Sequence, residues 1–140
     1  MNIEHLLHVK ASPADVYSTL TTEAGLAAIW TRDLSVSEQV GGISEFRFGP
    51  DDYANLQNTE LLPDRKVVWH CVDSDEEWTG TTISFDLEER SGATVITLRQ
   101  MDWRAVTDYY RSCNYNWAMF LMRLKQHCEN ENASKPATQS

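Results

Sequence analysis

The chain has 140 residues, enough for one domain with a single sizeable core but not for two. Its formal net charge of -9 at neutral pH repels phosphate backbones, and its 12 basic residues form no patch, so we expect no nucleic-acid partner. No apolar run approaches the ~20 residues that span a bilayer, and the N-terminus lacks the apolar core of a signal peptide. The three cysteines have no CxxC spacing. We therefore expect a cytoplasmic protein with free thiols and no membrane partner.

The first part of the chain predicts a strand followed by two short helices. Residues 3–9 have a period of two, with the odd-numbered positions facing inward. Ser12 can cap free backbone N–H groups and Pro13 suits the first helical position, so a short helix is expected to begin there. A threonine, Thr21 or Thr22, can cap a second short helix.

The middle of the chain predicts a meander of antiparallel strands. Gly41 and Gly42 predict a tight turn after a strand that ends near Val40. Pro63 begins a second turn, and the acidic run at 73–77 predicts a solvated loop. The expected strands cover about residues 33–40, 44–48, 53–62, 66–72, 82–87 and 94–100.

Residues 102–130 predict one long helix. Steps of three and four place its apolar residues on one face: Val106, Tyr110, Cys113, Trp117, Phe120, Leu121, Leu124 and Cys128. A long helix across a curved sheet encloses a space. The predicted fold class is therefore α+β, a curved antiparallel sheet of about six to seven strands wrapped on a long C-terminal helix, with two short helices after the first strand. We expect one domain at 1–131 and a disordered tail at 132–140.

Several segments, in this order, carry a family resemblance: ASPADVYSTLTTEAGLAAIWT, VGGISEFRFG, LLPDRKVVWHC, and GATVITLRQ followed by NWAMFLMRLKQHCE. Over about residues 3–130 the chain resembles the START-like (SRPBCC) superfamily of helix-grip proteins. This superfamily includes START domains, the birch-pollen allergen type and polyketide cyclases, and the chain is most similar to the branch related to the activator of Hsp90 ATPase. The resemblance implies a cavity that commonly accepts an apolar small molecule, in a superfamily of lipid carriers, cyclases, hydratases and cochaperone domains. The chain departs from the branch at Asn116, where glycine is usual, and at Cys71, where tryptophan is frequent.

The residues that could carry chemistry give little support for catalysis. No two of the four histidines have the i, i+4 spacing of a helical metal site, and no phosphate loop or dinucleotide fingerprint occurs, so we expect no metal and no cofactor. His5 could face the cavity as a base, although a core histidine is the simpler interpretation. Cys71 and Cys113 lie among apolar neighbours and are interpreted as small hydrophobic residues. We expect no catalytic residue.

Large aromatic residues on the inward faces could either fill the space between helix and sheet or line a cavity. Gln57 or Asn58, Gln100 and the Tyr110 hydroxyl could orient a ligand there. The expected cavity lining is Trp30, Phe46, Phe48, Trp69, Cys71, Phe85, Ile96, Leu98, Tyr110, Cys113, Trp117 and Phe120.

These observations lead to one functional hypothesis and two alternatives. The hypothesis is non-catalytic binding of a small apolar or aromatic molecule between the long helix and the sheet. The alternatives are a cyclase or hydratase that acts on a polyketide-like substrate, and a module that acts on a chaperone or regulatory partner. Tyr115, Ala118 and Met122 form a further apolar face, which predicts a monomer or a weak homodimer, with the dimer favoured.

Overall fold

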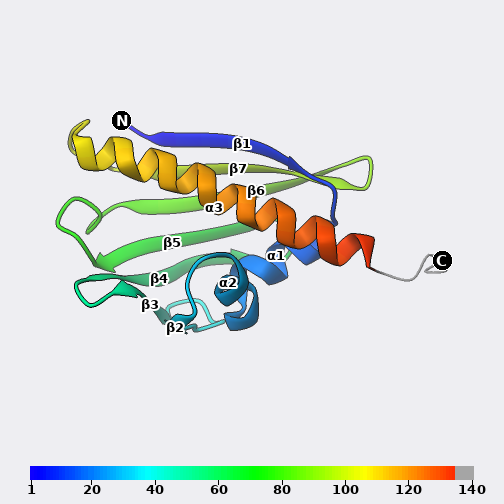
Figure 1. The fold of residues 1–140 in the computed structure, drawn as a ribbon, viewed down its shortest axis with the longest axis horizontal. Helices are drawn as coiled ribbons and strands as arrows, with labels where there is room; N and C mark the ends of the chain where they lie inside the picture. Colours follow the sequence, from blue (N-terminus) through cyan, green and yellow to red (C-terminus); the bar gives the residue numbers. More distant parts are fainter. Residues whose placement is uncertain (135–140) are drawn as a thin grey trace.

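Seven antiparallel strands form a single curved sheet, and the long helix α3 lies across one of its faces (Figure 1). The computed structural model describes residues 1–134, and the strand order is β1-β7-β6-β5-β4-β3-β2. This confirms the predicted α+β fold. The strands are β1 (Ile3–Val9), β2 (Asp33–Ser35), β3 (Ile43–Gly49), β4 (Asp52–Leu62), β5 (Lys66–Asp73), β6 (Thr82–Arg90) and β7 (Ala93–Met101), and the helices are α1 (Pro13–Thr21), α2 (Glu23–Ile29) and α3 (Asp108–Ala133).

The two short helices after β1 begin at predicted caps. Ser12 Oγ accepts a hydrogen bond from the Asp15 N–H at 3.2 Å, and Thr22 Oγ1 accepts one from the Gly25 N–H at 3.1 Å. A Cβ added to Gly25 would lie only 2.3 Å from the Thr19 carbonyl oxygen. Glycine therefore lets α2 approach α1 closely, and both helices contact α3.

The long helix begins later than its apolar pattern predicts. α3 starts at Asp108 because Thr107 Oγ1 accepts a hydrogen bond from the Tyr110 N–H at 3.1 Å and caps the helix there. Val106 therefore lies before the helix and is exposed, so its placement on the buried face was wrong.

The other end of α3 overlaps the predicted tail. The helix includes Asn132 and Ala133, and the Ser134 N–H donates to the Asn130 carbonyl oxygen at 3.2 Å. The remainder of the predicted tail, 135–140, lies outside the described residues. Between residues 1 and 134, no helix is long and apolar enough to cross a membrane.

The strand predicted up to Val40 is wrong, since β2 covers only 3 residues. The Asn58 side chain, which is buried on β4, donates to the carbonyl oxygens of Ser37 at 2.8 Å and Gln39 at 3.0 Å. A side chain thus satisfies carbonyl groups that a neighbouring strand would otherwise bond. The segment after β2 is a loop, while β2 itself still pairs with β3.

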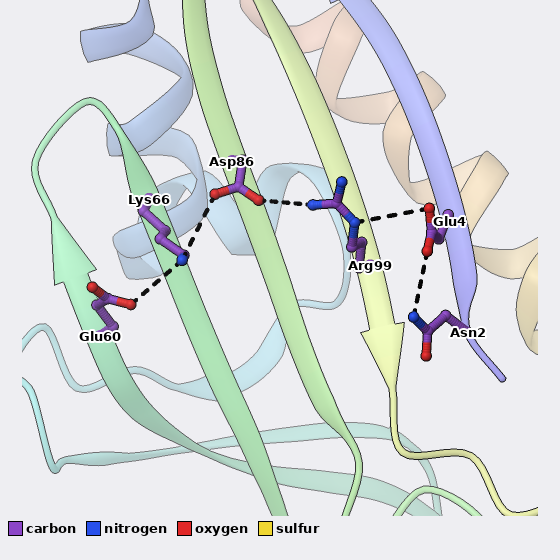
Figure 2. A network of polar contacts seen from close by, with 6 residues as sticks. All are labelled: Asn2, Glu4, Glu60, Lys66, Asp86 and Arg99. Carbon is purple, nitrogen blue, oxygen red and sulfur yellow. Dashed lines mark hydrogen bonds and ion pairs between the residues drawn. The ribbon is translucent and has the colours of Figure 1, made fainter.

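A row of alternating charges crosses the sheet on the face opposite α3 (Figure 2). Glu60 pairs with Lys66 at 3.7 Å, and Lys66 pairs with Asp86 at 3.9 Å. Asp86 accepts a hydrogen bond from Arg99 at 3.1 Å, and Arg99 lies 3.8 Å from Glu4. The row links β4, β5, β6, β7 and β1, so this face presents paired charges to solvent.

Candidate functional site

Aromatic side chains fill the centre of the space between α3 and the sheet. The Trp30 ring centroid lies 4.6 Å from that of Phe46 and 5.2 Å from that of Phe120, and Trp30 stacks on Trp69 at 6.0 Å. Trp117 lies 5.1 Å from Phe120. Apart from Trp30, which is half-buried, these side chains are at most 3% exposed. The centre of the predicted cavity is therefore occupied by the protein's own rings.

An open groove of about 390 Å³ lies beside this aromatic cluster, between α3 and the hairpin of β3 and β4. The loop that joins β5 to β6 forms one end of it. We call it the α3 groove, and its lining residues are Trp30, Phe48, Asp52, Tyr53, Ala54, Ser74, Trp78, Tyr109, Ser112, Cys113, Tyr115, Asn116, Trp117, Met119 and Arg123.

The predicted cavity residues divide between the groove and the closed core. Four of them line the α3 groove: Trp30, Phe48, Cys113 and Trp117. Phe48 is 38% exposed, so it lies toward solvent rather than inside the fold. Seven are buried in the core and do not line the groove: Phe46, Trp69, Cys71, Phe85, Ile96, Leu98 and Phe120. Tyr110 is half-buried beside β1, where its hydroxyl donates to the Asn2 carbonyl oxygen at 2.7 Å.

One wall of the groove is a second stripe on α3, next to the buried stripe that enters the core. Its members are again spaced by three and four residues, so they share one helix face. They are Tyr109, Ser112, Asn116, Met119 and Arg123. The stripe is mixed in polarity, which is why the apolar pattern of the sequence did not reveal it.

A chain of hydrogen bonds fixes two indole rings at the end of the groove nearest the β5–β6 loop. Trp117 Nε1 donates to Gln100 Oε1 at 2.7 Å, and Gln100 Nε2 donates to Thr81 Oγ1 at 2.9 Å. Thr81 Oγ1 donates to the Trp78 carbonyl oxygen at 2.6 Å, and Trp78 Nε1 donates to Cys113 Sγ at 3.1 Å. The rings of Trp78 and Trp117 stack 5.7 Å apart. Each indole N–H is satisfied within the protein, so the two rings are held rigidly.

A thiol and a phenol beside these rings are held in their neutral forms. Burial raises the pKa of the Cys113 thiol, and hydrogen bonds from Trp78 and Tyr109 offset only part of this effect. Burial also raises the pKa of the Tyr109 phenol. Away from the groove, burial raises the pKa of Cys71 to about 11. These thiols are therefore protonated at neutral pH and lack the thiolate that a nucleophile requires.

Most polar side chains expected to orient a ligand are engaged elsewhere. Asn58 and Gln100 are bonded inside the fold, and Gln57 Nε2 donates to the Gly41 carbonyl oxygen at 3.2 Å. His5 Nε2 is buried without a hydrogen-bond partner among residues 1–134, but His5 does not line the α3 groove. In the same part of the chain, no three His, Cys, Asp or Glu side chains gather as metal ligands would.

Several residues that line the groove are not predicted by the residue pattern of the sequence. Trp78 follows an acidic run that predicts a solvated loop, yet its side chain is buried. A large aromatic residue directly after that run was the available signal. Tyr53 and Tyr109 stand at strand and helix starts, where periodicity gives no direction. Arg123 is a polar residue outside the apolar stripe of α3, so the apolar pattern does not indicate that it lines a site.

The sheet, the two short helices and the long helix define a START-like (SRPBCC) protein. The sequence matches the family described as "Activator of Hsp90 ATPase homolog 1-like protein" over residues 10–129, and the chain belongs to this family. No curated protein matches the chain closely.

Solved structures agree with this assignment. The Aha1 dimer from Colwellia psychrerythraea is 37% identical with a TM-score of 0.85, and the match covers 92% of this chain and 96% of that chain. Protein MLL2253 from Mesorhizobium loti is 13% identical with a TM-score of 0.82, covering 97% and 100% of the two chains. DynU16, from the dynemicin biosynthetic locus, is 17% identical with a TM-score of 0.76, covering 91% of this chain and 47% of that chain. The last two similarities show the fold alone.

Proposed function

We propose that this protein binds a small apolar or aromatic molecule in the α3 groove and does not transform it. The observation that carries the proposal is an open groove of about 390 Å³ with aromatic rings on several sides. Ligand sites typically measure about 300–1,000 Å³ and are lined mainly by apolar and aromatic groups with a few polar ones. The rings come from α2's C-cap, β3, β4, the β5–β6 loop and α3, namely Trp30, Phe48, Tyr53, Trp78, Tyr109, Tyr115 and Trp117.

Binding is better supported than catalysis by the chemistry of the groove. Cys113 and Tyr109 have raised pKa values, chiefly because of burial, and neither supplies a nucleophile or base at neutral pH. His5, the base suggested for a cyclase or hydratase, does not line the groove. The base suggested for the enzyme alternative is therefore not positioned at the groove.

A blocking variant tests ligand binding. Ser112 is exposed and lines the groove, so Ser112→Phe should fill space there without disturbing the core. Asn114 is exposed on the same helix but does not line the groove, which makes Asn114→Phe the matched control. Titration with an apolar fluorescent dye should show binding to the unaltered protein and the control, and at least about tenfold weaker binding to Ser112→Phe, the loss expected from about 1.4 kcal/mol.

Unchanged dye binding by both variants would contradict a site in the α3 groove. A native mass spectrum of protein purified from its own host gives an independent readout, because a bound ligand adds a defined mass. Replacement of Ser112 should remove that added mass, whereas replacement of Asn114 should not.

A module that acts on a chaperone is the second candidate. It is favoured by the aromatic rings that close the core and by the family description, which refers to activation of the Hsp90 ATPase. This function requires no small molecule. Failure of the folded protein to bind any ligand in the titration would therefore support it.

We also propose that the protein forms a weak homodimer through the exposed apolar face of α3. Tyr115 is 66% exposed and Met122 is 43% exposed, with Ala118 between them. The loop before α3 packs Trp103 on Tyr110, with ring centroids 5.1 Å apart, and leaves this face open. The Colwellia psychrerythraea relative is a dimer. Because stable interfaces bury about 800 Å² per partner, a face this small supports only weak association.

The cytoplasm is the compartment that best fits the cysteine chemistry. Cys71, Cys113 and Cys128 are free thiols, and all three are buried. Free thiols persist in a reducing compartment, whereas oxidising compartments favour disulfides.

A further inference from the structure

The α3 groove contains one unused positive charge. Arg123 is the one cation and Asp52 the one carboxylate among the groove's lining residues. Arg123 is exposed and, within residues 1–134, takes part in no ion pair and no hydrogen bond from its side chain. In a chain with 21 acidic and 12 basic residues, an arginine without an acidic partner leaves a guanidinium available beside aromatic rings.

The charges of the groove lie toward opposite ends of its α3 wall. Tyr109 and Arg123 end that wall, about 21 Å apart along the helix axis at ~1.5 Å per residue. Burial chiefly raises the pKa of Tyr109, and the negative charges of Asp75 and Asp52 raise it further. Contacts place both carboxylates near this end: Ser74 Oγ donates to the carbonyl oxygen of Tyr53, next to Asp52, at 2.7 Å, and Trp78 Nε1 of the same β5–β6 loop donates to Cys113 Sγ at 3.1 Å, one turn of α3 from Tyr109. The groove is acidic at one end and basic at the other.

We propose that the ligand of the α3 groove is an aromatic molecule that carries one anionic group, a carboxylate or a sulfonate. This inference rests on the proposed function and adds the chemical class of the ligand. The planar guanidinium of Arg123 binds the anion with paired donors, as arginine does wherever carboxylates are recognised. The aromatic part lies against Trp30 and the neighbouring rings, and Asp52 repels the anion from the other end. The ligand therefore binds in a single orientation.

Two dyes that differ only in charge test this inference. Anilinonaphthalene sulfonate carries one anionic group, and N-phenylnaphthylamine has the same rings without it. The unaltered protein should bind the sulfonate dye more tightly. Arg123→Gln should lower the affinity for the sulfonate dye roughly three- to tenfold, the range for a charge-assisted pair at a partly exposed site. The affinity for the neutral dye should stay within about twofold of its value in the unaltered protein.

The control removes the same charge far from the groove. Arg65 is exposed in the turn between β4 and β5, at the opposite end of β4 from Asp52. Arg65→Gln should change the affinity for neither dye, which separates a local contact from the loss of net charge. Circular dichroism of each variant confirms that it is folded.

The outcomes distinguish this inference from the function on which it rests. If both dyes bind but Arg123→Gln lowers the affinity for both equally or for neither, the proposed anionic class of ligand is wrong. Binding in the groove is then still decided by the Ser112→Phe result. If Arg65→Gln lowers the affinity for the sulfonate dye as much as Arg123→Gln does, the effect comes from the net charge of the protein and the inference is also overturned. If neither dye binds the folded protein, both the inference and the proposed function fail.

Discussion

Trp117 combines ring packing and a hydrogen bond at one position of α3. Its ring contacts Trp30, Trp78 and Phe120, and its Nε1 donates to the fully buried Gln100. A buried indole N–H without a partner would lose its hydrogen bond to water and gain none in the protein, which would destabilise the fold. Gln100 is therefore a structural acceptor, which explains a buried amide in a strand otherwise rich in apolar residues.

The first stability prediction concerns this residue. Trp117→Ala removes a buried ring and should lower the free energy of unfolding by about 3–5 kcal/mol, as for other large core aromatics. Arg111 is exposed and pairs with Asp108 at the surface, so Arg111→Ala should cost less than about 0.5 kcal/mol. Denaturant titration measures both values. Similar costs for the two variants would mean that the buried face of α3 is misassigned.

Residue patterns predicted which side a ring faces but not how deeply it is buried. Phe46 and Phe48 share a face of β3 by alternation, yet Phe46 is buried and Phe48 is partly exposed. The register between β3 and β4 shifts between Arg47 and Gly49, so the strand is irregular where Phe48 stands. How deeply a ring is buried depends on such irregularities and on where α2 and α3 end. The local alternation of apolar and polar residues predicts neither.

At the scale of elements, α3 holds the edge strand β1 through side chains. These contacts bond backbone groups that an edge strand otherwise leaves open to other chains. They are Tyr110 Oη to the Asn2 carbonyl oxygen at 2.7 Å, Lys125 Nζ to the His8 carbonyl oxygen at 3.1 Å, and the Lys10 N–H to Glu129 Oε2 at 2.8 Å. The helix therefore both covers the core and blunts one edge of the sheet.

A pH-dependent prediction follows from Glu129. The Lys10 N–H lowers the pKa of this carboxyl from its ordinary 4.5, with help from Lys125. A lowered pKa in the folded state contributes stability above pH 4.5, and this stability is lost as the pH falls through the lowered value. Glu129→Gln should therefore be less stable than the unaltered protein at neutral pH, by less than about 1 kcal/mol for a partly exposed group. The difference should shrink in acid.

Urea titrations over a pH series measure that difference. Glu131→Gln is the control, since it removes the same charge two residues further along α3 and its partner His127 lies on α3 itself. The difference in the free energy of unfolding between Glu129→Gln and the unaltered protein could instead stay constant from neutral pH into acid. That result would show that the carboxylate charge does not act on β1.

The elements that could be predicted are those specified by neighbouring residues. Ser12 caps α1 and Pro13 is its first residue, and the period of two in β1 is continuous. The loop after β2 could not be predicted because it depends on Asn58, which is distant in the sequence. The start of α3 depends on Thr107, a weaker signal than the apolar pattern that continues through Val106.

At the scale of the whole molecule, the two large faces differ in what they can contact. The outer sheet face carries the paired charges of Figure 2, from Glu60 to Glu4, whereas α3 presents Tyr115 and Met122. Paired, hydrated charges gain little from burial in an interface, while exposed apolar groups gain more. A second copy is therefore expected on α3.

Light scattering across a concentration series tests this arrangement. Met122→Glu should raise the dissociation constant of the dimer at least about tenfold, because it would bury a charge without a partner. Leu6→Glu is the control: Leu6 is 61% exposed on β1, so it places the same charge on an apolar residue away from α3. A mass that remains monomeric at high concentration excludes the dimer. If Leu6→Glu is the variant that dissociates it, the interface lies on the sheet.

The α3 groove itself is a property of the whole molecule. The aromatic pattern predicted a site between α3 and the sheet, but it could not tell that Phe46 and Trp69 would close the centre. Trp78 enters the site only because a loop after β5 folds back onto Trp117. Such a placement depends on contacts between distant parts of the chain, so four of the predicted lining residues reach the groove and the others do not.

The position of β1 at the sheet edge also affects how the chain folds during synthesis. β1 pairs with β7, and the register joins Ile3 to Gln100. At about 5–20 residues per second, β1 leaves the ribosome roughly 5–20 s before the strand that it must pair with. α3 follows later still, so for that time the rings of Trp30 and Trp69 have no helix to cover them. The nascent chain must therefore carry uncovered apolar strands until α3 has been synthesised, and its folded yield depends on how well it avoids other chains in that interval.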